Sequence, residues 1–283
     1  MIKAIVFDVD GVLKGSKEGI NFPIPHADVI QKLKTLREEG IPVILCSGNY
    51  LHSILKIIQL ANLRNPHISD RGALIVDPLD GVVLEKHLLQ RKYVKEIIKT
   101  ILSAGFYMEV YSDNEYFVQK SQVSELTKKR TVILQEQPVL VDSFEEIFSK
   151  DIIKINIFSK NEEEKEKATK ALSHIKNEIA IVWLSNPATG TMHIANVTSK
   201  DISKPYAVQQ VLQRMHINSK DVLGVGDTLS DWEFMSLCGY TAAMGNADSA
   251  LKELVKTKGE GKYFIAPHVD DNGVLEALKH FSL

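Results

Sequence analysis

The sequence predicts an α/β protein in which a parallel-sheet core is interrupted by an inserted α+β domain. Apolar runs of strand length alternate with amphipathic helical stretches at both ends of the chain, and the middle of the chain follows a different pattern. The 283 residues are also long for one hydrophobic core and comfortable for two. Because parallel strands need a crossover between them, the alternating ends favour a Rossmann-like sheet with helices on its faces.

The first part of the core is expected within residues 1–85. Its predicted elements are a strand over Ile2–Phe7, a helix over Ala27–Glu39, a strand over Ile41–Leu45 and a helix over Leu51–Ala61. Two short strands, Ala73–Val76 and Val82–Leu84, flank a run with Pro and Gly over Asp77–Gly81, which predicts a hairpin. This part therefore supplies βα units that can begin a parallel sheet.

The inserted domain is expected over residues 86–187, and the second part of the core over residues 188–283. The elements predicted for the insertion are a helix over Val94–Leu102, strands over Tyr107–Tyr111, Tyr116–Gln119 and Ile152–Phe158, a helix over Glu162–Ser173 and a strand over Ile179–Leu184. That set is enough for a separate α+β core. After Met192–Ile194 the alternation of strand and helix resumes and continues to the C-terminus.

Composition is typical of a globular protein and excludes several classes of function. The net charge is −2, so no basic excess suggests nucleic acid as a partner. No apolar run approaches the ~18–20 residues of a membrane helix, and the run from Ile2 ends at Asp8, so neither a membrane span nor a signal peptide is predicted. Cys46 and Cys238 lie in apolar context and are expected to be buried thiols. A cytoplasmic location is expected, and the oligomeric state is not predicted.

Asp8-Val9-Asp10-Gly11 directly follows the first predicted strand. Two carboxylates two residues apart at a strand end point the same way, and the glycine allows a tight turn beyond them. In an α/β sheet this edge faces the ligand crevice. Asp8 could attack an electrophile while Asp10 moves the proton of the leaving group. The alternative is an ordinary strand that ends in an Asp-Gly turn.

A second pair of carboxylates follows a strand far downstream. Asp227 lies at the end of a strand predicted over Val222–Val225, and Asp231 lies one helical turn further on, in a helix predicted over Leu229–Leu237. Two acidic groups at such a junction are stabilised by a bound cation, and a site with only oxygen ligands suits Mg²⁺. The alternative is that Asp227 only caps the helix.

Two further segments offer contacts for an anion. Ser47 and Gly48 lie between the second predicted strand and its helix, where a hydroxyl and backbone N–H groups bind phosphate readily. Lys204 is followed by Pro205 at the start of another predicted helix, a place where the helix dipole disfavours a cation. A lysine at such an unfavourable position often binds an anion. The alternatives are a plain turn at Ser47 and a solvated lysine, with Lys200 as a nearby competitor.

Together these four segments, in this order, resemble the haloacid dehalogenase-like (HAD) superfamily of phosphohydrolases. They are the Asp-x-Asp-Gly segment at Asp8, the Ser-Gly turn at Ser47, Lys204 at a helix start and the Gly-Asp-x-x-x-Asp segment at Asp227. Within the superfamily the chain is most similar to the Cof-type branch, whose large cap is inserted between the second and third motifs. Weaker likenesses over residues 70–75 and 271–274 support that branch.

The resemblance implies a Mg²⁺-dependent phosphohydrolase that acts on a small phosphorylated metabolite, with sugar phosphates the leading class and the inserted cap selecting the substrate. Asp8 would attack phosphorus to form an aspartyl-phosphate, and Asp10 would protonate the leaving group and then activate water. Ser47, Gly48 and Lys204 would bind the phosphate. The implied metal ligands are Asp8, the Asp10 backbone carbonyl, Asp227 and Asp231, the last directly or through water.

Some positions depart from the family pattern, and other functions stay open. Asn49 stands where the family usually has Arg, Ser230 where it has Asn, and Arg71 where it has Asn. A sugar phosphomutase of the same superfamily, a non-catalytic protein that binds a phosphoryl ligand and a phosphorylated receiver domain are the alternatives. The cap offers few arginines for a second phosphate, which disfavours the mutase. The complete acidic set and its lysine disfavour the binding protein, and the insertion disfavours the receiver.

Overall fold

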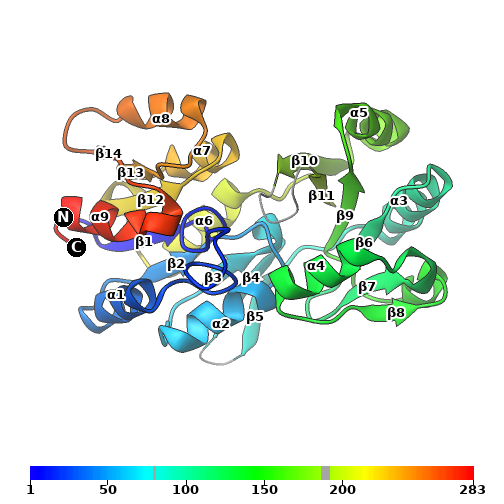
Figure 1. Cartoon of the computed structure of the whole chain (residues 1–283), viewed down its shortest axis with the longest axis horizontal. Coiled ribbons are helices and arrows are strands. Elements are labelled where there is room, and N and C mark those ends of the chain that lie inside the picture. Colours follow the sequence, from blue (N-terminus) through cyan, green and yellow to red (C-terminus); the bar gives the residue numbers. More distant parts are fainter. Residues whose placement is uncertain (79–80, 186–191) are drawn as a thin grey trace. The chain divides into compact units, whose positions relative to one another are not determined.

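The computed structural model describes residues 1–78, 81–185 and 192–283, and its elements are labelled in Figure 1. The chain divides into two compact units. The core unit comprises Met1–Ser47, Ile54–Leu84 and Ser203–Leu283. The inserted unit comprises Gly48–Ser53 and Glu85–Ile202. Segments from both ends of the chain therefore build the core unit. Among the described residues, no helix combines the length and the hydropathy needed to cross a membrane.

The core unit contains a five-stranded parallel sheet in the order β14-β13-β12-β1-β2. Its strands are β1 (Ala4–Phe7), β2 (Val43–Leu45), β12 (Val222–Gly226), β13 (Tyr240–Ala243) and β14 (Tyr263–Ile265). From β1 the chain proceeds to β2 on one side, while β12 pairs with β1 on the other side. The direction of winding therefore reverses at β1 and β12, and ligands of α/β sheets bind at the carboxyl ends of strands at such a reversal.

Helices cover both faces of this sheet (Figure 1). The helices of the core unit are α1 (Ala27–Glu38), α2 (His52–Leu60, which begins in the inserted unit), α6 (Lys204–Arg214), α7 (Trp232–Met235), α8 (Ser249–Lys256) and α9 (Gly273–His280). Helices α6, α7 and α8 share one apolar cluster with β1 and β2, in which Val6 and Ile44 are fully buried. A small sheet of β3 (His67–Ser69), β4 (Leu74–Asp77) and β5 (Val82–Lys86) follows α2.

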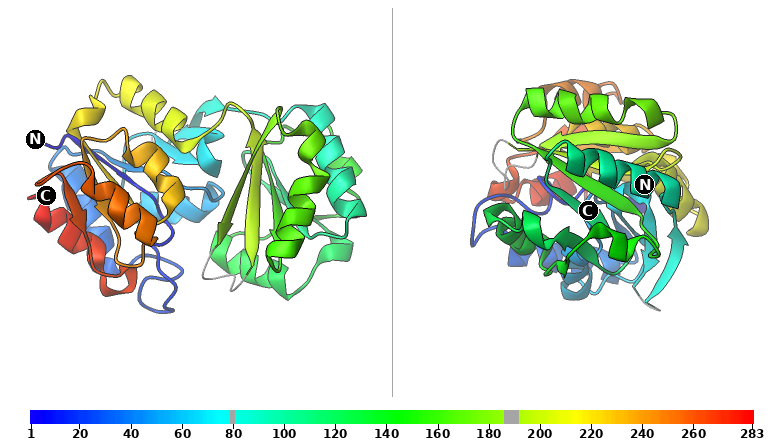
Figure 2. Two further views of the ribbon diagram at one scale, coloured as in Figure 1. Left: turned by 90° about the horizontal axis from the view of Figure 1, so that it is seen from above. Right: turned by 90° about the vertical axis from the view of Figure 1, so that its right-hand side faces the viewer.

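The inserted unit is built on a six-stranded, mostly antiparallel sheet in the order β10-β11-β9-β6-β7-β8. Its strands are β6 (Met108–Tyr111), β7 (Tyr116–Gln119), β8 (Val139–Val141), β9 (Lys154–Ser159), β10 (Ile179–Ser185) and β11 (His193–Ser199). Its helices are α3 (Arg91–Ser103), α4 (Glu125–Leu134) and α5 (Glu162–Ala171). Helices α3 and α5 lie against one face of the sheet and share an apolar cluster with it (Figure 2). The unit thus has a hydrophobic core of its own.

The structure differs from the sequence-based prediction at one boundary of the insertion. Strand β11 pairs with β9 and β10, so it belongs to the inserted sheet, and the core unit resumes at Ser203 rather than at residue 188. The sequence cannot show this, because a strand pattern does not reveal which sheet the strand joins. The predicted boundary itself, and Leu79 and Asp80 of the predicted hairpin turn, lie outside the described residues. The helix predicted over Leu229–Leu237 is a 3₁₀ turn followed by the short α7.

Candidate active site

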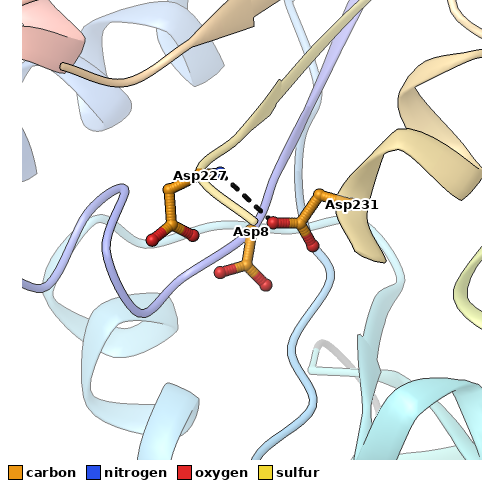
Figure 3. Close-up of side chains that lie close together, drawn as sticks. All are labelled: Asp8, Asp227 and Asp231. Carbon is orange, nitrogen blue, oxygen red and sulfur yellow. Dashed lines mark hydrogen bonds between the residues drawn. The ribbon is translucent and has the colours of Figure 1, made fainter. Parts of the chain in front are cut away.

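Three carboxylates meet where β1 and β12 end (Figure 3). Asp8 follows β1, and its backbone N–H donates to the carbonyl of Val225 on the paired strand at 2.9 Å. Asp227 follows β12, and Asp231 ends the 3₁₀ turn beyond it. One carboxylate oxygen from each of Asp8, Asp227 and Asp231 lies within 4.8 Å of the other two. The parallel pairing of β1 and β12 therefore gathers residues that are more than two hundred positions apart in the chain.

Lys204 lies among these carboxylates. It is the first residue of α6, and the side chain of Ser203 caps the helix by accepting the Tyr206 N–H. The Lys204 ammonium donates to Oδ1 of Asp8 at 2.5 Å and to Oδ1 of Asp231 at 2.7 Å. These two contacts offset the unfavourable position of a cation at a helix start. Lys200, the competitor left open by the sequence, is exposed in the turn after β11.

Asp231 uses both of its oxygens for hydrogen bonds within the protein. Oδ1 accepts from Lys204, while Oδ2 accepts from the backbone N–H groups of Asp227 (3.2 Å, dashed in Figure 3) and Thr228 (3.0 Å) and from the Thr228 hydroxyl (2.9 Å). Burial alone would raise the pKa of Asp231, but Lys204 and Thr228 lower it more, and the pKa lies below its usual range. Asp231 therefore orients Lys204 and the loop after β12. Ser230, one of the departures from the family pattern, shares a 2.8 Å hydrogen bond with the Thr228 hydroxyl.

Asp8 and Asp227 are carboxylates with too little positive charge around them to stabilise both as anions. Burial raises the pKa of Asp8 to about 7, and the attraction of Lys204 is opposed by Asp231 and Asp10. Burial and the charge of Asp8 raise the pKa of Asp227 well above its usual range. Oδ1 of Asp227 is buried, with no hydrogen-bond partner among the residues described. An unused carboxylate oxygen in an oxygen-only cluster fits a hard divalent cation such as Mg²⁺.

The loop after Asp8 approaches Asp227 so closely that it requires a glycine. Gly11 has a φ of +84°, and a Cβ at that position would lie 2.0 Å from Oδ2 of Asp227. The carbonyl of Gly11 accepts from Nδ2 of Asn246 at 2.8 Å, and the same nitrogen lies 3.4 Å from Oδ2 of Asp227. Sequence reasoning missed Asn246, although its place just beyond the carboxyl end of β13, the neighbour of β12, was a usable signal. Asp10 lies in the same loop, 3.7 Å from the ammonium of Lys14.

Ser47 and Gly48 follow β2, which pairs with the other edge of β1. The N–H of Cys46 donates to the carbonyl of Phe7 at 2.8 Å, so this turn starts beside the end of β1. The N–H of Ser47 donates to the carbonyl of Ile68 at 2.9 Å, which joins this turn to β3. The carbonyl of Gly48 accepts from the ammonium of Lys154 within the inserted unit.

Arg71 is a second buried cation of the core unit. It has a φ of 60°, which non-glycine residues rarely adopt, and its N–H donates to the carbonyl of Ser47 at 3.1 Å. Burial lowers the pKa of Arg71, while Glu233, Asp231 and Asp8 raise it by a smaller amount. Its guanidinium lies 3.8 Å from the partly exposed carboxylate of Glu233. A long basic side chain here replaces the asparagine usual in the family with a positive charge near the acidic cluster.

Comparisons with known proteins agree with this geometry. A family model described as haloacid dehalogenase-like hydrolase matches residues 5–278. Phosphatase YwpJ of Bacillus subtilis is 24% identical over 99% of both chains, and a phosphoglycolate phosphatase of Staphylothermus marinus is 24% identical over 92% of this chain and 94% of that protein. Among solved structures, a haloacid dehalogenase-like hydrolase from Bacteroides thetaiotaomicron superposes with a TM-score of 0.84 at 19% identity over 99% of both chains. A HAD subclass IIB sugar phosphatase superposes with a TM-score of 0.77 at 23% identity, also over 99% of both chains.

The family match spans both parts of the core and the whole insertion. The similar solved structures confirm the α/β fold, and the names of the curated relatives confirm the predicted phosphatase class. Three of the four motifs that predicted the family, those of Asp8, Lys204 and Asp227, meet at the carboxyl ends of β1 and β12. The chain therefore belongs to the haloacid dehalogenase-like hydrolases.

Proposed function

We propose that the chain is a Mg²⁺-dependent phosphomonoesterase that acts on a small phosphorylated metabolite, with sugar phosphates the leading class. The observation that carries this proposal is the Asp8 carboxylate, buried at the ligand edge of the sheet with one oxygen on Lys204. A carboxylate held in this way has its second oxygen left for attack on phosphorus. The similar HAD subclass IIB sugar phosphatase supports the substrate class.

Asp8 is the nucleophile of the proposed reaction. One of its oxygens forms a bond to phosphorus while the bond from phosphorus to the ester oxygen breaks, which gives an aspartyl-phosphate. Lys204 contacts Asp8 and offsets the negative charge that the carboxylate and the phosphate bring together. The Ser47 hydroxyl and the N–H of Gly48 are proposed to hold phosphate oxygens, because they follow the neighbouring strand β2.

Asp10 transfers the protons. It gives a proton to the ester oxygen as that oxygen departs, and it later takes a proton from the water that hydrolyses the aspartyl-phosphate. Ionised Asp8, Asp227 and Asp231 and a phosphate dianion carry more negative charge than Mg²⁺ and Lys204 neutralise. For that reason Asp10 is best kept protonated when substrate binds.

Asp8, Asp227 and the backbone carbonyl of Asp10 are the residues proposed to hold Mg²⁺. When bound, the cation neutralises the carboxylates and the phosphate and stabilises charge on the phosphoryl oxygens. Asp231 has both oxygens occupied, which favours contact with the metal through water rather than directly. The inserted unit is proposed to be the cap that selects the substrate, since the acidic cluster lies in the core unit.

The test is phosphate release from a panel of phosphorylated metabolites with Mg²⁺ present. We expect turnover of at least one sugar phosphate, loss of that turnover in chelator and recovery when Mg²⁺ is returned. The variant Asp8→Asn should abolish turnover, because an amide does not attack phosphorus, while Asp201→Asn on an exposed turn should not. Full activity in chelator, or turnover by Asp8→Asn, would show that these roles are wrong.

A further inference from the structure

Lys14 is a buried cation close to Asp10. Only 1% of the residue is exposed, and its ammonium nitrogen has no hydrogen-bond partner among the described residues. The carboxylate of Asp10 lies nearby, with Oδ1 3.7 Å from the ammonium. Burying an ammonium group without hydrogen bonds is strongly unfavourable. A lysine in this position is therefore poor for stability and calls for a functional explanation.

The backbone fixes the two side chains next to each other. The carbonyl of Val9 accepts from three consecutive N–H groups, those of Val12 (3.4 Å), Leu13 (2.9 Å) and Lys14 (2.8 Å). The carbonyl of Lys14 in turn accepts from the N–H of Gly11 at 2.6 Å. These bonds close a tight loop in which Asp10 and Lys14 form an isolated β-bridge. Their proximity is thus a property of the loop and not of one flexible rotamer.

The two side chains differ in their access to solvent. The Asp10 side chain is 33% exposed, whereas that of Lys14 is 2% exposed. The ammonium is therefore enclosed by the protein, whereas the carboxyl group of Asp10 reaches solvent. An ammonium so enclosed is not placed to bind an anionic part of the substrate itself.

We propose that Lys14 is a positioning residue for Asp10, an inference that rests on the proposed phosphatase mechanism. Its ammonium attracts Oδ1 and so turns Oδ2 toward the ester oxygen. As the P–O bond breaks, the ester oxygen takes the electron pair of that bond and the proton of Asp10, and Asp10 is left as a carboxylate.

The test compares two kinds of leaving group in Lys14→Met. An alkoxide leaving from a sugar phosphate needs the proton of Asp10, whereas the p-nitrophenolate of p-nitrophenyl phosphate does not. The ratio kcat/KM includes only the steps up to departure of the leaving group, so later hydrolysis does not obscure the comparison. We expect kcat/KM for the best sugar phosphate of the panel to fall about 10- to 100-fold, and that for p-nitrophenyl phosphate by less than about 3-fold.

Two further variants make the result interpretable. Lys3→Met removes a lysine from an exposed pair with Asp221 in the same unit and should change neither substrate. Lys14→Arg keeps the positive charge and should restore most of the turnover of the sugar phosphate. Lys14→Met should unfold at no lower temperature than the parent protein, because methionine fits an apolar surrounding without a charge to desolvate.

Several outcomes would overturn the inference. Equal losses of kcat/KM for both substrates in a folded Lys14→Met would mean a general structural role. Lys14→Arg losing as much sugar phosphate turnover as Lys14→Met would exclude a role of the charge. If Lys14→Met does not fold, a fall of about 10-fold or more in kcat/KM for the sugar phosphate in folded Lys14→Arg would exclude that role by itself. Failure of the phosphatase mechanism has a different signature, because Asp8→Asn would then keep activity toward both substrates.

Discussion

Single residues of the site show how hydrogen bonds stabilise some members of a buried cluster of like charges. Asp231 accepts four hydrogen bonds, and the only charged donor among them is Lys204. Asp8 and Asp227, which accept fewer, have raised pKa values. The same residue type therefore serves different purposes at neighbouring positions, according to the donors that surround it.

The variant Asp231→Asn tests the role of this residue. The amide nitrogen of asparagine would face a hydrogen-bond donor in place of one carboxylate oxygen. Either Lys204 or the loop at Thr228 should therefore lose its hydrogen bond to residue 231. We expect kcat to fall about 100-fold, as for a catalytic group displaced by about 1 Å, while the Mg²⁺ concentration for half-maximal activity stays within about 3-fold. A Mg²⁺ titration of phosphate release measures both quantities. A tenfold or larger rise in the Mg²⁺ requirement, with kcat retained at saturation, would instead make Asp231 a direct ligand.

Motifs identified some residues of the candidate site and could not identify others. Asp8, Lys204 and Asp227 follow strands or open helices, and their places follow from local pattern together with the rule for strand ends. Asn246 lies just beyond the carboxyl end of β13, a place that the same rule could have singled out, whereas Lys14 lies in a loop whose residues carry no periodic signal. Their contacts with Asp227 and Asp10 depend on how the loops fold, and no spacing in the sequence encodes this.

At the scale of elements, β3 contains a fully buried histidine. Nδ1 of His67 accepts from the N–H of Leu45 on β2 at 3.2 Å, so the neutral ring helps to join the two strands. Burial lowers the pKa of His67 to about 3. The unfolded chain binds this proton below about pH 6.5, and the folded protein does not bind it until about pH 3. Stability from this group is therefore complete above pH 6.5 and is lost as the pH falls through that window.

The variant His67→Asn should flatten this dependence, because the amide oxygen can accept from Leu45 but does not titrate. Between about pH 6 and pH 4, the free energy of unfolding of the parent protein should fall more steeply than that of the variant, by at most ~1.4 kcal/mol per pH unit. Urea unfolding across this range measures the two slopes. His216→Asn is the matched control at an exposed position whose φ of 55° suits asparagine. Parallel slopes for His67→Asn and the parent protein would contradict the buried neutral histidine.

The elements themselves were largely predictable, and their partners were less so. Strand β7 has the predicted bounds, and β1 and β10 differ from prediction by two residues or fewer at each end. Strand β11 was expected at the start of the resumed core but joins the inserted sheet. Local alternation predicts that a strand forms, while the side chains that bury it decide its sheet.

At the scale of the whole molecule, the chain shares its fold with proteins that have few identical residues. Solved relatives at 19–23% identity superpose over 99% of the chain. The apolar pattern predicts this architecture, and the resemblance of four motifs to the HAD superfamily predicts the phosphatase class. The substrate is not predictable in the same way, because it depends on individual side chains and not on a repeating pattern.

The proposed role of the inserted unit as a cap leads to a prediction about substrate size. A separate cap domain that selects the substrate should admit small phosphorylated metabolites and exclude folded proteins. We expect phosphate release from sugar phosphates and little from a folded phosphoprotein under the same conditions. A short phosphopeptide from that protein serves as the control for size. Efficient turnover of the phosphoprotein, with none of the sugar phosphates hydrolysed, would contradict the proposed role of the insertion.

The attack of Asp8 on phosphorus is tested most directly by trapping the phosphorylated residue. Asp10→Asn is mixed with p-nitrophenyl phosphate, whose leaving group needs no acid, so that Asp8 is phosphorylated while hydrolysis lacks its base. The protein is quenched in acid, reduced with borohydride and mapped by mass spectrometry. An aspartyl-phosphate at position 8 should be found as homoserine there, absent without substrate and absent when Asp8→Asn is added to the variant. Homoserine at another aspartate, or p-nitrophenol release in the first turnover without any reduced residue, would contradict nucleophilic attack by Asp8.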